Sequence, residues 1–178
     1  MKPLYTLPEI HAKIAAIGAE ISVDYVGKHP LLIGVLKGAT VFMAHLLVHI
    51  YIDCEIDFMT VSSYKHRTES GELKLVQDLD TNISGRHVIL VEDIFDTGKT
   101  ADFVIKYLKS RGAASVEMAV FVNKEHSRVF PIPDPRYLCF SYNDKPFLIG
   151  FGFDFGERYR NLPGVYQLEE MDKVAPVV

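Results

Sequence analysis

Apolar residues along the chain form two kinds of segment that alternate. In residues 7–27 isoleucines recur at helical spacing, at positions 10, 14, 17 and 21, which predicts a helix. Short, nearly continuous apolar runs such as 30–36 and 87–91 are typical of strands that are buried on both faces. Further helices are predicted at 41–51 and 100–112, and further strands at 54–64, 73–79, 115–123 and 137–142. This alternation predicts an α/β fold with one open, mainly parallel twisted sheet that helices flank.

Length and charge narrow the class of protein. The 178 residues suit a single domain over positions 1–178, and the hydrophobic share of 48% is that of an ordinary globular protein. A net charge of −4 argues against a nucleic-acid binder. Cys54 and Cys139 lack the spacing of a metal site and suggest reduced thiols. Because neither a signal peptide nor a bilayer-spanning apolar run is visible, we expect a cytoplasmic protein with no membrane partner.

The stretch VILVEDIFDTGKT, residues 88–100, combines an anion site with acids. Its last four residues open the predicted helix, whose free N–H groups and dipole attract an anion, and Gly98 permits close approach. They are Thr97, Gly98, Lys99 and Thr100. A P-loop would need glycine where the chain has Asp93, so a P-loop kinase is nearly excluded. The stretch therefore predicts a different kind of phosphate site at the carboxyl end of a strand.

Three carboxylates in this stretch, Glu92, Asp93 and Asp96, must face something other than the phosphate. Two like charges about 5 Å apart repel by roughly 3 kcal/mol at an effective dielectric of about 20. Carboxylates suit sugar hydroxyls and Mg²⁺ instead. The stretch thus predicts a sugar phosphate ligand, with Asp96 placed to act as a base. The plainer alternative is a strand end with solvated acids and Asp96 as a helix cap.

Residues 88–100 resemble the phosphoribosyl pyrophosphate signature of type I phosphoribosyltransferases, and other motifs are similar to the hypoxanthine-guanine branch. The likeness spans roughly residues 30–165. It implies that Glu92 and Asp93 hold ribose hydroxyls or Mg²⁺, and that residues 97–100 anchor the 5′-phosphate. It also implies that Asp96 accepts a proton from the purine ring, and that the cofactor is Mg²⁺.

The resemblance implies roles for two further motifs that contact pyrophosphate. Lys37 and Gly38, in LKGAT, would present backbone N–H groups to it, with the Leu36–Lys37 peptide in cis. Ser63 and Tyr64 would belong to a mobile lid over about residues 63–75 that excludes water. Taken alone, each motif is also compatible with an ordinary turn or strand end.

A base-binding hood over about residues 124–170 is implied as well. Lys124 would donate to the 6-oxo group of the purine, although a lone lysine is more often a surface residue. The other implied contacts are stacking on Phe147, backbone groups of Leu148, the acid Asp154 linked to Mg²⁺ and the base, and pyrophosphate binding by Arg160. The implied catalytic residues are Asp96, Arg160 and Lys124.

One departure from the family pattern lies beside Phe147, where DKPF carries the additional residue Pro146. The expected activity transfers a phosphoribosyl group from phosphoribosyl pyrophosphate to hypoxanthine or guanine, giving IMP or GMP. Alternatives are another base, such as xanthine, uracil, orotate or adenine, and an RNA-binding regulator that reuses the fold. Expected partners are the two small substrates and no nucleic acid, and family members assemble as homodimers or homotetramers.

Overall fold

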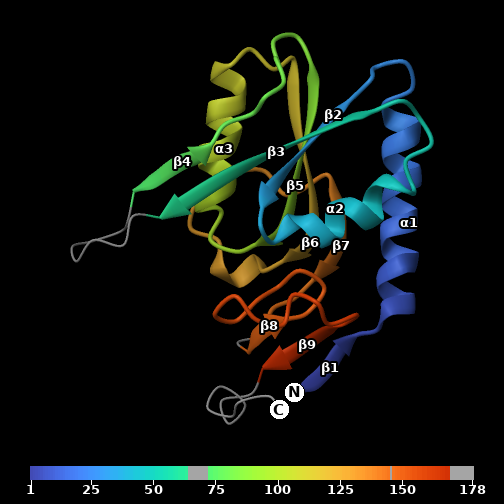
Figure 1. Ribbon diagram of the computed structural model, residues 1–178, viewed down its shortest axis with the longest axis vertical. Helices are drawn as coiled ribbons and strands as arrows, with labels where there is room; N and C mark the ends of the chain where they lie inside the picture. The colour runs from blue at the N-terminus through green and yellow to red at the C-terminus, as the bar shows by residue number, and fades with distance from the viewer. Residues whose placement is uncertain (64–71, 145, 169–178) are drawn as a thin grey trace.

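The computed structural model describes residues 1–63, 72–144 and 146–168, which form two sheets and three α-helices (Figure 1). The main sheet has six strands in the order β4-β3-β2-β5-β6-β7, and only β4 runs antiparallel to its neighbour. Its strands are β2 (Leu31–Leu36), β3 (Glu55–Ser63), β4 (Leu73–Gln77), β5 (His87–Phe95), β6 (Ser115–Asn123) and β7 (Tyr137–Ser141). The predicted open, mainly parallel sheet is confirmed.

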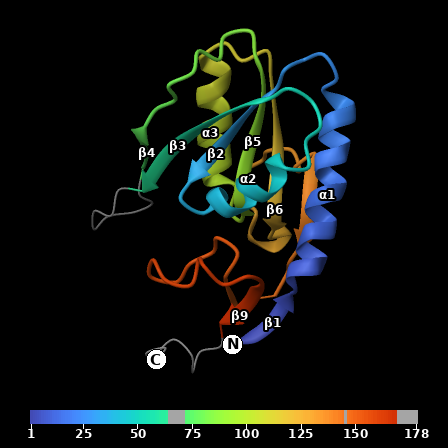
Figure 2. The same cartoon turned by 45° about the vertical axis from the view of Figure 1, so that its right-hand side comes forward.

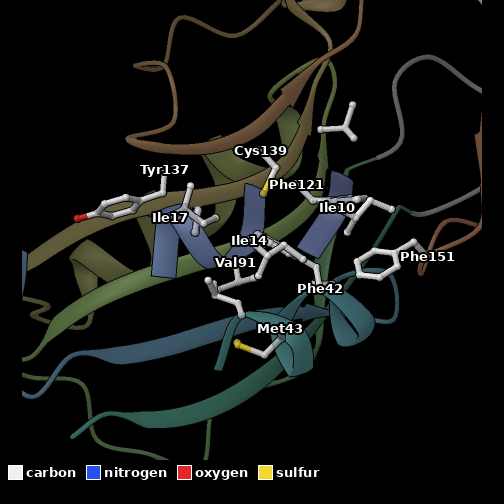
Figure 3. Packing of buried hydrophobic residues seen from close by; sticks show 14 of the residues in the cluster. Ile10, Ile14, Ile17, Phe42, Met43, Val91, Phe121, Tyr137, Cys139 and Phe151 are labelled. Carbon is white, nitrogen blue, oxygen red and sulfur yellow. The ribbon is translucent and has the colours of Figure 1, made fainter. Parts of the chain in front are cut away.

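Helices cover both faces of this sheet because side chains alternate along its strands. Ile89 and Val91 of β5 pack with α1 (Leu7–Asp24) and α2 (Ala39–Leu47) in one core cluster. Val88 and Leu90, from the same strand, pack with α3 (Lys99–Ser110) in the other. Figure 3 shows the first cluster, where the isoleucines of α1 lie against aromatic side chains of α2 and β6.

The long helix α1 begins where its sequence predicts. The backbone N–H of Thr6 donates to the Glu9 carboxylate at 2.8 Å, and Pro8 lies in the first turn, where its missing N–H is harmless. The isoleucine stripe that predicted this helix is fully buried or nearly so. None of the described helices is both long and apolar enough to span a bilayer.

A second sheet forms the hood and joins the two ends of the chain. It has three antiparallel strands in the order β1-β9-β8: β1 (Lys2–Tyr5), β9 (Val165–Leu168) and β8 (Phe147–Ile149). Figures 1 and 2 place it beyond one end of the main sheet, next to the start of α1. A small hood of terminal segments was expected, with its base-binding part over about residues 124–170. Strand β1 lies outside that range, and none of β1, β8 and β9 was predicted as a strand.

Candidate active site

Two of the three acids of residues 88–100, Glu92 and Asp93, lie inside β5. This strand continues to Phe95 and does not end at residue 91 as predicted. Alternation along the strand therefore separates their side chains. Glu92 lines a small cavity near the start of α3, whereas the Asp93 carboxylate lies against Gly38 at the start of α2. The sequence placed both acids at one edge, and the structure divides them between two parts of the site.

Both acids are held in surroundings that disfavour their charge. The Glu92 side chain is 6% exposed, and its Oε1 atom has no hydrogen-bond partner within the described structure. Burial raises the pKa of Glu92 well above its ordinary value, and the neighbouring Asp93 raises it further. Burial also raises the pKa of Asp93 to about 6, although two backbone N–H groups oppose the shift. A hydroxyl donor or a cation from a ligand would stabilise the ionised form of such carboxylates.

The anion site at the start of α3 depends on Gly98. This residue adopts φ +85°, a left-handed conformation that favours glycine, and it directly precedes the helix at Lys99. The helix therefore begins at Lys99, between the two starts that the sequence suggested, Thr97 and Thr100. A cavity of about 130 Å³ opens here, lined by Glu92 and residues 94–101. The backbone N–H groups of the first helical turn border this cavity, and that of Lys99 donates to Thr97 Oγ1 at 3.3 Å. A helix start of this kind has the chemistry to hold an anion.

Residues 128–130, which sequence reasoning overlooked, hold the loop at 97–98 in place. The backbone N–H groups of Val129 and Phe130 both donate to the Thr97 carbonyl, at 3.0 and 3.1 Å. The Arg128 guanidinium lies 3.6 Å from the centroid of the Phe95 ring and donates to Asn123 Oδ1 at 2.8 Å. The loop at 97–98 is therefore fixed by residues that follow β6, and no local sequence signal indicated this.

The Lys37 turn approaches the same site from β2. The Leu36–Lys37 peptide is cis, as the resemblance implied. Lys37 Nζ donates to Glu157 at 2.9 Å, and Arg160 lies 3.5 Å from the same Glu157 oxygen and 2.8 Å from Asp154 Oδ1. The two cations expected to bind pyrophosphate thus share one carboxylate. Glu157 was not a predicted site residue, because nothing in FGERYRN distinguishes it from a surface acid.

The expected base-binding residues also come together. The Lys124 ammonium lies 6.0 Å from the centroid of the Phe147 ring and 5.9 Å from that of Tyr142. Phe147 is 53% exposed and therefore available for stacking, whereas Leu148 is buried and joins β8 to β9. A cavity of about 500 Å³ lies beside them, lined by Lys124, His126, Ser127, Tyr142, Asn143 and Asp144.

The acids fit magnesium only as part of a shared site. Among the described residues, no three acidic, histidine or cysteine side chains converge as metal ligands. The Asp154 carboxylate already accepts from Arg160 and from the backbone N–H of Glu157. Glu92, whose Oε1 atom has no hydrogen-bond partner among the described residues, and Asp93 are each suitable oxygen ligands, but they face different parts of the site. Mg²⁺ is commonly bound by one or two carboxylates together with substrate phosphates, so either acid could take part in such a site.

The expected lid and one apolar hollow lie apart from the candidate site residues described so far. Ser63 ends β3 opposite Leu73, so residues 73–75 of the expected lid belong to β4, and Tyr64 lies outside the described residues. A hollow of about 510 Å³ lies on the outer side of α3, between Leu73 and Phe130. We do not place the active site there, because its wall is mainly apolar and includes neither Asp96 nor the acids of β5.

Comparison with known proteins shows the family of the chain. A family model described as a phosphoribosyl transferase domain matches residues 2–156. Hypoxanthine-guanine phosphoribosyltransferase of Streptococcus agalactiae is 48% identical over 170 residues, which are 95% of this chain and 93% of the relative. That of Streptococcus mutans is also 48% identical, with the same coverage.

Solved structures agree. A hypoxanthine phosphoribosyltransferase from Staphylococcus aureus superimposes with a TM-score of 0.89 at 36% identity, covering 94% of this chain and 91% of the other. A hypoxanthine-guanine phosphoribosyltransferase from Bacillus anthracis gives 0.88 at 33% identity, with coverage of 95% and 98%. With the signature cradle at the end of β5 and these matches over most of its length, the chain belongs to the phosphoribosyltransferase family.

Proposed function

We propose that this enzyme transfers the phosphoribosyl group of phosphoribosyl pyrophosphate to hypoxanthine or guanine, giving IMP or GMP and pyrophosphate. The observation that carries the proposal is the cavity at residues 94–101, which Asp96 and the buried Glu92 line, together with the Lys124–Phe147 pair, whose lysine donates its backbone N–H to the Phe95 carbonyl of the same cavity wall. The relatives named for this activity support it. Neither another base nor an RNA-binding regulator has comparable support.

Different residues would bind the 5′-phosphate, the ribose and the pyrophosphate of the substrate. The helix start at Thr97–Thr100 would hold the 5′-phosphate, which positions the sugar without reacting. Glu92 and Asp93 would meet ribose hydroxyls or the metal. Lys37, the Gly38 backbone and Arg160 would bind pyrophosphate once Glu157 gives way.

At the other end of the site, Lys124 would select a 6-oxo group, since an ammonium only donates. Phe147 would stack on the base, and backbone groups of Leu148 and the Asp154 region would contact its edge.

Asp96 is the candidate base. Its Oδ1 atom is buried and makes no hydrogen bond to any described residue, so it remains available to a ligand. It would accept the proton that the purine ring loses as the new bond to ribose forms. The ribose carbon develops oxocarbenium character as pyrophosphate leaves. When bound with the substrate, Mg²⁺ would neutralise charge on the leaving group.

Pyrophosphate release with a panel of free bases tests the proposal. We expect turnover with hypoxanthine and guanine and none with uracil or adenine. We expect Asp96→Asn to lower kcat by about 10²–10⁴-fold while binding of phosphoribosyl pyrophosphate persists. Unchanged turnover in this variant would remove Asp96 from the mechanism, and a different preferred base would replace the substrate assignment.

The proposal also includes a cytoplasmic location and a homodimer or homotetramer. Both come from the family resemblance. Cell fractionation tests the first, and light scattering of the purified enzyme tests the second.

A further inference from the structure

Tyr142 is a buried tyrosine next to Lys124, one of the expected base-binding residues. It follows β7, and its backbone N–H donates to the Asn123 carbonyl at 2.8 Å, directly before Lys124. Its side chain is 4% exposed and packs in the core cluster that includes Leu148. Tyr142 thus lies between the main sheet and the hood.

The hydroxyl of Tyr142 links β9 of the hood to the residue just before β8. It accepts a hydrogen bond from Gln167 Nε2 at 3.1 Å and donates to the Pro146 carbonyl at 3.4 Å. Gln167 lies on β9 directly opposite Leu148 of β8. A buried phenol needs both a donor and an acceptor, and these two groups supply them.

The ring of Tyr142 contributes a second contact. The Lys124 ammonium lies 5.9 Å from its centroid and 6.0 Å from that of Phe147, so two aromatic rings border the cation. At these distances a cation is attracted to the ring faces. The phenol therefore acts on the lysine through its ring and on the stacking strand through its hydroxyl.

We propose that Tyr142 is a positioning residue for the purine base. It orients Lys124 and fixes the backbone of residues 146–148, and it thereby sets the affinity for the 6-oxopurine. The contact to the Pro146 carbonyl gives the additional residue of this loop a defined position. This inference rests on the proposed function, since it concerns the base of that same reaction.

Tyr142→Phe tests the hydroxyl while keeping the ring. We expect the KM for hypoxanthine and guanine to rise about three- to ten-fold, because one or two hydrogen bonds are lost. The KM for phosphoribosyl pyrophosphate should stay within about two-fold, because its contacts lie elsewhere. Gln167→Met, which removes the other partner, should raise the same KM. The double variant should be no worse than Tyr142→Phe alone, since that substitution already removes the hydrogen bond to Gln167.

Tyr137→Phe is the matched control. Tyr137 is also buried and lies on β7, but its hydroxyl donates to Asp24 at 2.7 Å, away from the base-binding residues. We expect it to lower Tm without changing either KM. If Tyr142→Phe alters both KM values equally, or leaves that of the base unchanged, Tyr142 is not a positioning residue.

Calorimetric titration of IMP separates the two levels of the argument. If the wild-type enzyme does not bind IMP, the proposed function fails and this inference fails with it. If wild type binds IMP and Tyr142→Phe binds it as tightly, this inference alone is overturned.

Discussion

Gly38→Ala places one methyl group where the structure has room for none. The backbone of Gly38 is right-handed helical, with φ −57° and ψ −43°, so alanine suits its conformation. A Cβ atom there would overlap the Asp93 carboxylate, whose Oδ1 atom lies 2.9 Å from the ideal position and whose other atoms lie closer. The effect of the substitution is therefore steric and falls on one functional side chain.

Two opposing contributions set its magnitude. Because the backbone conformation of Gly38 suits alanine, the substitution stabilises by about 0.4–1 kcal/mol through the unfolded chain. Overpacking costs about 1–3 kcal/mol, so we expect a net loss of about 1 kcal/mol and a Tm lower by about 2–4 °C. Because Asp93 must move, the affinity for magnesium-bound phosphoribosyl pyrophosphate should fall on the order of ten-fold or more. Thermal unfolding and calorimetric titration measure the two effects.

A double-mutant cycle with Asp93→Ala decides whether the clash is the cause. Once the carboxylate is absent, the methyl group no longer collides with it. Gly38→Ala should then stabilise the protein by about 0.4–1 kcal/mol, because alanine restricts the unfolded chain. Equal destabilisation by Gly38→Ala in both backgrounds would refute the reasoning.

Three further variants probe other parts of the site and fold. Lys124→Ala should raise the KM for hypoxanthine and guanine about 10- to 100-fold by removing a charged donor. Steady-state kinetics should show an unchanged KM for phosphoribosyl pyrophosphate, and equal losses for both would instead indicate misfolding. Glu157→Gln should lower the KM for phosphoribosyl pyrophosphate about two- to five-fold at low salt, because a competing carboxylate is removed. An unchanged value would show that Glu157 does not compete. The pKa of Asp78 is lowered chiefly by the Tyr107 hydroxyl, with help from the backbone of Leu79 and from Arg111. Its carboxylate thus stabilises the fold above the ordinary pKa of about 4, and the contribution is lost as the pH falls through the depressed value. Asp78→Asn should lower Tm at neutral pH, and thermal scans should show the difference shrinking in acid.

Local chemistry in the sequence predicted an anion site. The spacing of apolar residues depends only on helix and strand geometry, so α1 and the buried strands followed from it. A helix start just after a strand exposes N–H groups wherever the helix packs, and residues 97–100 therefore indicated an anion site. The resemblance then supplied Lys124 and Phe147. In the structure the Lys124 ammonium lies 6.0 Å from the centroid of the Phe147 ring.

Local patterns could not show contacts between distant segments. Strands β1 and β9 are short, and their pairing joins the two ends of the chain, so neither has a strong local signal. Glu157 meets Lys37 across 120 positions, and Tyr142 meets Gln167 across 25. These contacts depend on how the hood packs against the sheet.

By itself, then, the sequence determined the α/β class and the chemistry of residues 88–100, because both arise from neighbouring residues. Tertiary structure alone decided that Glu92 and Asp93 point to different parts of the site, that Glu157 pairs with both Lys37 and Arg160, and that the Tyr142 hydroxyl contacts Pro146 and Gln167. The physical reason is that burial and charge pairing depend on which distant segments are in contact. Residue periodicity depends only on neighbouring residues, so it does not predict those contacts.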